Sequence, residues 1–192
     1  SSGEAPELVT VSGLVRCSPS GSVASIDDAE MPKTGGSEAL AVRHQRAAGT
    51  EREGNGIIID SEGHVLTIGY LILEAKSIEV TGPEGEVMAA TFVGYDYDTG
   101  FGLLRVDKSL DIQPMKLGNS SDLKAGDPAL VAGHKGSSAV SGIRVAARKE
   151  FTGYWEYLLD NAIYTIPPYD NYGGAALIGS DGALLGIGSI FT

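Results

Sequence analysis

From Gly54 onward, short apolar runs alternate with turn residues about every 8–12 positions, a spacing typical of all-β sandwiches and barrels. Ile78 and Val80 alternate with polar neighbours, and residues 143–147 repeat the same period of two. This period predicts strands that bury one face. The turn residues Ser180-Asp181-Gly182 predict a hairpin between the last two runs. The expected strands cover 56–60, 64–68, 78–81, 87–94, 102–106, 128–132, 143–147, 175–178 and 183–187.

The first 50 residues lack this regularity. Residues 8–11 and 14–17 have the composition of strands, whereas 18–37 is rich in Ser, Gly, Pro and Asp and predicts a long loop. The run 38–43 suits a strand or a short helix, and 71–76 is the best short helix candidate elsewhere. A seam near 117–123 divides the regular part into two lobes. We therefore expect an irregular extension over 1–50 that partly contributes first-barrel strands, a first β-barrel over 51–116 and a second over 117–192.

The chain carries 25 acidic and 14 basic residues, which gives a formal net charge of −11. Such a chain is a poor partner for nucleic acid or for an anionic membrane surface. No apolar run approaches the roughly 18 residues of a membrane span, so we expect no membrane insertion. No lysine, arginine or histidine follows Lys149. This acidic last quarter indicates a solvated surface or, alternatively, contact with a cationic partner.

Cysteine and histidine residues give no sign of a metal centre. Cys17 is the single cysteine, which excludes an internal disulfide and a multi-cysteine zinc site. The histidines His44, His64 and His134 are dispersed and have no carboxylates at ligand spacing, so we expect no metal and no cofactor. All three suit exposed turn or loop positions. The cysteine count leaves the compartment open.

Four groups of residues follow one another in an order that indicates a family. They are Gly54-Asn55-Gly56-Ile57-Ile58-Ile59-Asp60 with Leu66-Thr67, Gly94-Tyr95-Asp96 with Leu103-Leu104-Arg105-Val106, Leu117-Gly118-Asn119-Ser120 with Gly126-Asp127, and Gly174 with Asp181-Gly182 and Gly186-Ile187. Their order resembles the trypsin-like domain of the HtrA (DegP-like) bacterial serine proteases. The resemblance implies an all-β trypsin/chymotrypsin-like double β-barrel, with closed or partly open six-stranded barrels and a site between them. It also implies a periplasmic location, with the cytoplasm left open, and we expect no PDZ-like domain after the last barrel strand.

The catalytic positions that the resemblance implies carry residues without the required chemistry. The family follows Leu-Thr with two residues and then its histidine, where this chain has Tyr70. The family's aspartate falls on Gly100. Its serine falls on Gly173 by counting back from the last hairpin, or on Tyr172 by the Asn-x-Gly-Gly pattern. All three triad positions have changed, and the 36 residues between Gly142 and Gly179 contain neither serine nor cysteine.

Acyl transfer needs an attacking oxygen or sulfur and a base within hydrogen-bond reach of it. Backbone N–H groups of Asn171 and Gly173 would form a residual oxyanion hole. Without a triad, such a hole accelerates hydrolysis only about 10³–10⁴-fold over the reaction in water. Tyrosine rings near the degenerate site either fill the vacated space or form an aromatic surface for a peptide or side chain. The expected cleft-lining residues are Tyr164, Tyr169 and Tyr172.

We therefore interpret the chain as a catalytically inactive HtrA-type pseudoprotease that binds an unidentified peptide or protein, or has a structural role. Enzyme activity is not expected. The alternative is an active serine endopeptidase with an unrecognised nucleophile, for which Ser137, Ser138 and Ser141 near His134 are candidates. A scaffold with a closed cleft is a third interpretation. The oligomeric state stays open.

Overall fold

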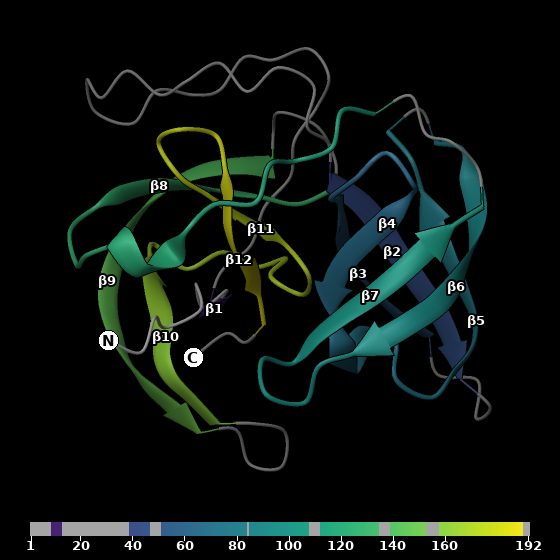
Figure 1. Cartoon of the computed structure of the whole chain (residues 1–192), viewed down its shortest axis with the longest axis horizontal. Helices are drawn as coiled ribbons and strands as arrows, with labels where there is room; N and C mark the ends of the chain where they lie inside the picture. Colours follow the sequence, from purple (N-terminus) through teal and green to yellow (C-terminus); the bar gives the residue numbers. More distant parts are fainter. Residues whose placement is uncertain are drawn as a thin grey trace, which may run out of the picture.

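The structure, a computed structural model, describes residues 9–12, 39–46, 51–83, 85–107, 112–134, 139–152 and 158–189. Two closed six-stranded β-barrels lie side by side, the first in blue and teal and the second mostly in green and yellow (Figure 1). The predicted all-β double-barrel fold is confirmed. No helix in the described part of the chain has the length and apolar character to cross a membrane.

The first barrel consists of six antiparallel strands in the order β2-β3-β4-β7-β6-β5, and β5 pairs with β2 to close it. In β5, Ile78 and Val80 are buried and Glu79 is exposed, as the period of two predicts. Ile68 and Leu104 lie fully buried in the interior. The strands are β2 (Ala39–Arg46), β3 (Glu51–Ile58), β4 (His64–Ile68), β5 (Ala75–Thr81), β6 (Val87–Tyr95) and β7 (Phe101–Val106).

The second barrel has the order β1-β10-β9-β8-β11-β12, and β1 pairs with both β10 and β12. In β9, Ile143 and Val145 are buried and Arg144 is exposed, again as predicted. Strand β10 was not among the strands predicted from the sequence. The strands are β1 (Val9–Ser12), β8 (Pro128–Ala132), β9 (Val140–Thr152), β10 (Leu158–Ile166), β11 (Ala176–Ile178) and β12 (Leu184–Gly188).

The segment between the barrels binds to each of them in turn. Met115 N–H donates to Ile58 O of β3 at 2.9 Å. One residue later, Lys116 O accepts from Leu184 N–H of β12 at 2.8 Å, and Gly118 N–H donates to Leu184 O at 2.8 Å. The 3₁₀ turn η2 (Ser120–Asp122) follows and leads into the second barrel. The chain therefore passes from one barrel to the other at Met115–Lys116.

The N-terminal extension contributes to both barrels. Strand β2 belongs to the first barrel, and β1 belongs to the second, a placement that the sequence did not indicate. Within the run 38–43, residues 39–43 belong to strand β2 rather than to a helix, and residue 38 lies outside the described residues. The expected helix at 71–76 is replaced by the 3₁₀ turn η1 (Gly69–Leu71) and the start of β5. The expected strand at 14–17 and loop at 18–37 lie outside the described residues.

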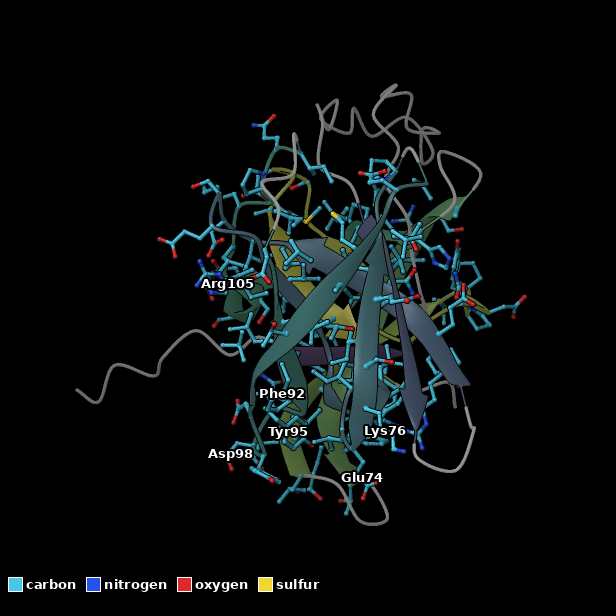
Figure 2. All side chains as sticks on the ribbon, turned by 90° about the vertical axis from the view of Figure 1, so that its right-hand side faces the viewer. Glu74, Lys76, Phe92, Tyr95, Asp98 and Arg105 are labelled. Atoms are coloured by element: carbon cyan, nitrogen blue, oxygen red, sulfur yellow. The ribbon has the colours of Figure 1, made fainter. Side chains whose placement is uncertain are left out.

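Strand β6 presents apolar side chains on the outer surface of the first barrel. Phe92 is 46% exposed and Val93 is 47% exposed, and the β6–β7 register shifts between Phe92 and Gly94. An extra residue at such a bulge reverses the inside–outside alternation, which explains why two successive side chains face solvent. Figure 2 shows Phe92 on the same face as Tyr95, whose ring stacks edge-on against Tyr97 with centroids 4.6 Å apart.

Asp60 organises the turn between β3 and β4. Its Oδ1 accepts from Glu62 N–H at 2.9 Å and from His64 N–H at 3.1 Å, and its Oδ2 lies 2.6 Å from His64 Nδ1. Burial by itself raises the pKa of Asp60, but the bonds from His64 and Glu62 outweigh it, so the pKa lies below the ordinary value of 3.8. The folded state therefore prefers the ionised carboxylate.

We expect Asp60→Asn to destabilise the protein at about pH 6, and we expect this effect to shrink as the pH falls through the folded-state pKa of Asp60, which lies below 3.8. A lowered folded-state pKa adds stability that is present above the unfolded-state pKa and is lost as the pH falls through the folded-state value. Urea unfolding across this pH range measures the difference. Exposed Asp107→Asn, which removes the same charge without these contacts, is the matched control. An Asp60→Asn difference that is independent of pH would contradict the expectation.

Candidate functional site

The positions predicted for the degenerate triad lie close together between the barrels. Tyr70 belongs to η1, directly after β4 of the first barrel, and Gly173 precedes β11 of the second. A Cβ atom built on Gly173 would lie 2.8 Å from the Tyr70 hydroxyl and 3.7 Å from Cζ of the same ring. The hydroxyl donates to Ser189 O at 3.0 Å, and Arg52 Nη1 donates to Tyr70 O. The tyrosine hydroxyl therefore occupies the space where a nucleophile side chain at Gly173 would begin.

Gly100 lies beside Tyr70 at the start of β7. Its carbonyl accepts from Gly69 N–H at 2.7 Å, one residue before Tyr70, and its own N–H donates to Asp96 O at 2.9 Å. Its φ of +76° is in the left-handed region, which favours glycine. An aspartate at this position would have a strained backbone, whereas glycine adopts this conformation without strain.

Asn55 connects the two barrels through the loop that contains Gly173. It is fully buried in β3, its N–H donates to Gly173 O at 2.8 Å, and its Nδ2 donates to Gly173 O at 2.9 Å and to Asn171 O at 3.3 Å. On the same residue, the carbonyl accepts from Thr67 Oγ1 at 2.6 Å. One buried amide side chain thus holds two carbonyls of the loop that the sequence predicts to correspond to a protease nucleophile loop.

The amide oxygen of Asn55 binds His134. Asn55 Oδ1 accepts from His134 N–H at 2.7 Å and lies 3.0 Å from His134 Nδ1. His134 Nε2 lies 3.2 Å from Glu53 Oε1, and the imidazole is 15% exposed. Because the two loop carbonyls fix Nδ2 of Asn55 toward them, Oδ1 faces the imidazole and both ring nitrogens face acceptors. Both ring nitrogens of His134 therefore contact protein atoms. The expectation of an exposed loop histidine at 134 is wrong.

The backbone of this loop fits closely against β3. Gly174 has φ +84°, and a Cβ there would lie 2.0 Å from Asn55 O. A Cβ on Gly54 would lie 2.3 Å from Leu71 Cδ1 and 2.6 Å from Gly173 O. Glycine is therefore required on both sides of the contact, because only bare backbone allows the two segments to approach each other.

The three predicted cleft tyrosines have different surroundings. Tyr169 is half-buried, and its hydroxyl donates to Ala139 O at 2.8 Å. Tyr172 is half-buried before Gly173, and its carbonyl accepts from Ala175 N–H at 3.1 Å. Tyr164 lies on β10, where the Lys149 ammonium is 4.6 Å from its ring centroid. Their role in binding stays a prediction, as does the oxyanion hole at Asn171 and Gly173.

The alternative catalytic residues are placed as follows. His64 is the first residue of β4 and contacts Asp60, whereas Tyr70 follows the other end of that strand. Ser141 is a half-buried residue at the start of β9, and Ser137 and Ser138 lie outside the described residues. Within the part of the chain that the structure describes, no three His, Cys, Asp or Glu residues form a group that could hold a metal ion.

Sequence reasoning missed the importance of Asn55, although one local signal was present. Asn55 is a polar residue between two glycines in a run that otherwise reads as buried strand. A buried polar side chain needs partners, and flanking glycines allow another backbone to approach. The pattern indicates that something binds there, but the sequence does not identify Asn171, Gly173 and His134 as the partners.

The fold is shared with solved proteases. The structure of an HtrA-type protease, AlgW with tripeptide, has a TM-score of 0.63 and 24% identity over 78% of this chain and 49% of that one. The active form of a protease from M. tuberculosis has a TM-score of 0.67 and 22% identity over 88% of this chain and 79% of that one. At these identities the comparisons show a common fold.

Sequence comparisons give the family. A probable periplasmic serine protease do/HhoA-like of Haemophilus influenzae is 32% identical over 139 residues, which are 70% of this chain and 30% of the relative. The periplasmic pH-dependent serine endoprotease DegQ of Escherichia coli is 30% identical over 148 residues, 74% of this chain and 32% of the relative. The chain thus spans about a third of these relatives. Residues 54–187 match the model of the trypsin-like peptidase domain, and the chain therefore belongs to that family, with HtrA-type proteases as its relatives.

Proposed function

We propose that this chain is a catalytically inactive trypsin-like domain of HtrA type that binds a peptide or protein. The observation that carries the proposal is the position of the Tyr70 hydroxyl, 2.8 Å from where a Cβ on Gly173 would lie. The place of the nucleophile is thereby filled by a side chain from the histidine position. Hydrolysis of an amide needs an attacking atom beside a proton acceptor, and neither role has a suitable group here.

Tyr70 itself is a poor nucleophile in this setting. A phenol has a pKa near 10 and attacks well only as the phenolate. The Tyr70 hydroxyl donates to the carbonyl of buried Ser189, and this bond requires the protonated, neutral phenol. Tyr70 therefore acts as a filler that closes the former catalytic centre and links the barrels.

The alternative of an unrecognised serine nucleophile has little support from His134. Its Nδ1 faces Asn55 Oδ1, and its Nε2 faces Glu53 Oε1. Because both ring nitrogens are engaged by protein oxygens, neither is directed at a serine hydroxyl whose proton it would accept. Binding is the remaining function that fits a trypsin-like fold, because the relatives described as endoproteases act on polypeptides.

We expect a fluorophosphonate probe to leave the protein unmodified at neutral pH, as measured by intact-protein mass spectrometry, while trypsin treated in parallel is fully labelled. Each reacted serine would add one probe mass, because the probe needs an activated hydroxyl. Stoichiometric labelling would refute the inactive assignment. In a second arm, fluorescence anisotropy with a random-peptide library tests for binding. Absence of binding at high micromolar concentration would favour the closed-scaffold interpretation.

A further inference from the structure

Strand β6 and the turn that follows it place a row of apolar side chains on the outer surface of the first barrel. The row consists of Phe92, Val93, Tyr95 and Tyr97 and is called the β6 strip. Phe92 and Val93 are each nearly half exposed, and Tyr97 is 73% exposed. Soluble proteins rarely leave several large apolar side chains next to one another in solvent unless the surface binds something. The β6 strip is therefore a candidate contact surface.

The aromatic part of the β6 strip is held in place by the barrel itself. The Tyr95 ring packs over Gly69 in η1, where a Cβ would lie 1.9 Å from Tyr95 Cε2. Tyr97 then meets the Tyr95 ring edge-on, with the centroids 4.6 Å apart and the ring planes at 81° to each other. A surface whose side chains are already fixed loses little conformational entropy when a partner binds. The β6 strip thus has the rigidity of a preformed interface.

The two ends of the β6 strip carry exposed charges of opposite sign. Arg105 on β7 is exposed at one end. Asp98 is exposed at the other end, in the β6–β7 turn, where the Asp96 carboxylate accepts from Asp98 N–H at 3.1 Å. Figure 2 shows Phe92 and Tyr95 between these two charged residues. Among the described residues, neither the Arg105 guanidinium nor the Asp98 carboxylate has a hydrogen bond or an ion pair.

We propose that the β6 strip is the contact surface for a second copy of this chain, arranged around a twofold axis that passes through the strip. A twofold contact brings the same surface of both copies together in opposite directions. The apolar side chains then cover one another, and Arg105 of each copy lies beside Asp98 of the other, which gives two intermolecular ion pairs. The inference goes beyond the proposed peptide or protein binding, and it does not involve the former catalytic centre.

The distribution of charge favours a second copy over an unrelated partner. A surface that binds a uniformly acidic or basic partner would carry a single sign of charge, whereas the β6 strip is complementary to itself. The net charge of −11 makes two copies repel each other at long range. At about 0.15 M salt the Debye length is about 8 Å, so this repulsion is largely screened while charges in direct contact still attract. The strip is small, and we expect weak association with a dissociation constant on the order of 100 μM.

Charge exchange between the two ends tests the proposed arrangement. Arg105→Asp and Asp98→Arg each place like charges opposite one another, and a twofold contact contains each change twice. We expect each variant alone to associate at least ~10-fold more weakly than wild type in sedimentation equilibrium. An equimolar mixture of the two variants should associate about as strongly as wild type, because one copy then carries two acidic ends and the other carries two basic ends. This recovery would also show that both variants are folded.

A mixture that associates no better than the separate variants would overturn the proposal, as would a wild-type chain that stays a single copy at ~1 mM. The apolar part of the strip has its own test, in which we expect Val93→Ser to weaken association at least ~5-fold. The matched control is Leu158→Ser on β10 of the second barrel, where the leucine is 55% exposed, and we expect it to leave association unchanged. Equal weakening by both changes would reject the β6 strip as the contact surface.

Discussion

Replacing Asn55 with alanine lowers the free energy of unfolding by about 3 kcal/mol, because several buried polar groups lose their partner at once. Asn55 is 0% exposed, and its amide binds Gly173 O, Asn171 O and His134. Each buried group left without a partner costs about 1–3 kcal/mol, and water that enters the vacated space reduces the total. The urea midpoint at unchanged slope measures the loss.

Two further variants separate the Asn55 bonds from the general effect of removing an asparagine. Asn119→Ala removes an exposed side chain whose bond is local, to Ser121 N–H at 3.1 Å, and we expect a loss of about 1 kcal/mol or less. Asn55→Asp keeps the size and shape of the side chain but replaces the Nδ2 donor with an oxygen that faces the two carbonyl oxygens. We therefore expect it to lower the free energy of unfolding nearly as much as Asn55→Ala does. If Asn55→Ala costs no more than Asn119→Ala, Asn55 does not hold the loop.

Replacing Gly173 with alanine costs about 1–3 kcal/mol in wild type and much less in a Tyr70→Phe background. The backbone of Gly173 is outside the left-handed region, so the added methyl group meets only the Tyr70 hydroxyl at 2.8 Å. Moving the hydroxyl breaks its bond to Ser189 O. Without the hydroxyl, the nearest atoms are Tyr70 Cζ at 3.7 Å and Leu71 Cδ1 at 3.8 Å, which are ordinary contact distances.

A double-mutant cycle measures this coupling between Gly173 and Tyr70. The cycle compares the free energies of unfolding of four proteins: wild type, Gly173→Ala, Tyr70→Phe and the double variant. We expect the double variant to lose about 1 kcal/mol less stability, or better, than the sum of the two single losses. Gly174→Ala is a contrasting control, since its Cβ would meet Asn55 O at 2.0 Å and its φ is +84°. Tyr70→Phe should not rescue it. Strict additivity at Gly173 would show that the hydroxyl does not fill the nucleophile position.

These two predictions concern side chains that form hydrogen bonds between the two barrels. Tyr70 bridges to Ser189, and Asn55 bridges to Gly173 and to His134. Both residues belong to the first barrel, and Ser189 and Gly173 belong to the second half of the chain. In an active protease this interface must leave room for the substrate and for the water molecule that hydrolyses the acyl-enzyme. Here Tyr70 and Asn55 extend across this interface and form hydrogen bonds with the second half of the chain.

Much of the architecture was predictable because strand periodicity is a local property. The alternation at Ile78 and Val80 and the hairpin turn at 180–182 were both identified from neighbouring residues. Strand β10 was missed: Asp160 and Asn161 interrupt its apolar run, and its register with β9 shifts between Leu159 and Ala162. Such an irregularity hides the period of two on which recognition of a strand depends.

The family and the all-β class could be inferred from the sequence alone, because they depend on which residues are present and on short-range order. The loss of the triad stays a prediction. Only the tertiary structure decided which groups meet between the barrels. Asn55 and Gly173 are 118 residues apart and meet only when the barrels pack together. The closure of the second barrel by β1 depends on a pairing between the two ends of the chain. Such contacts join groups through space, and no local pattern specifies the partner.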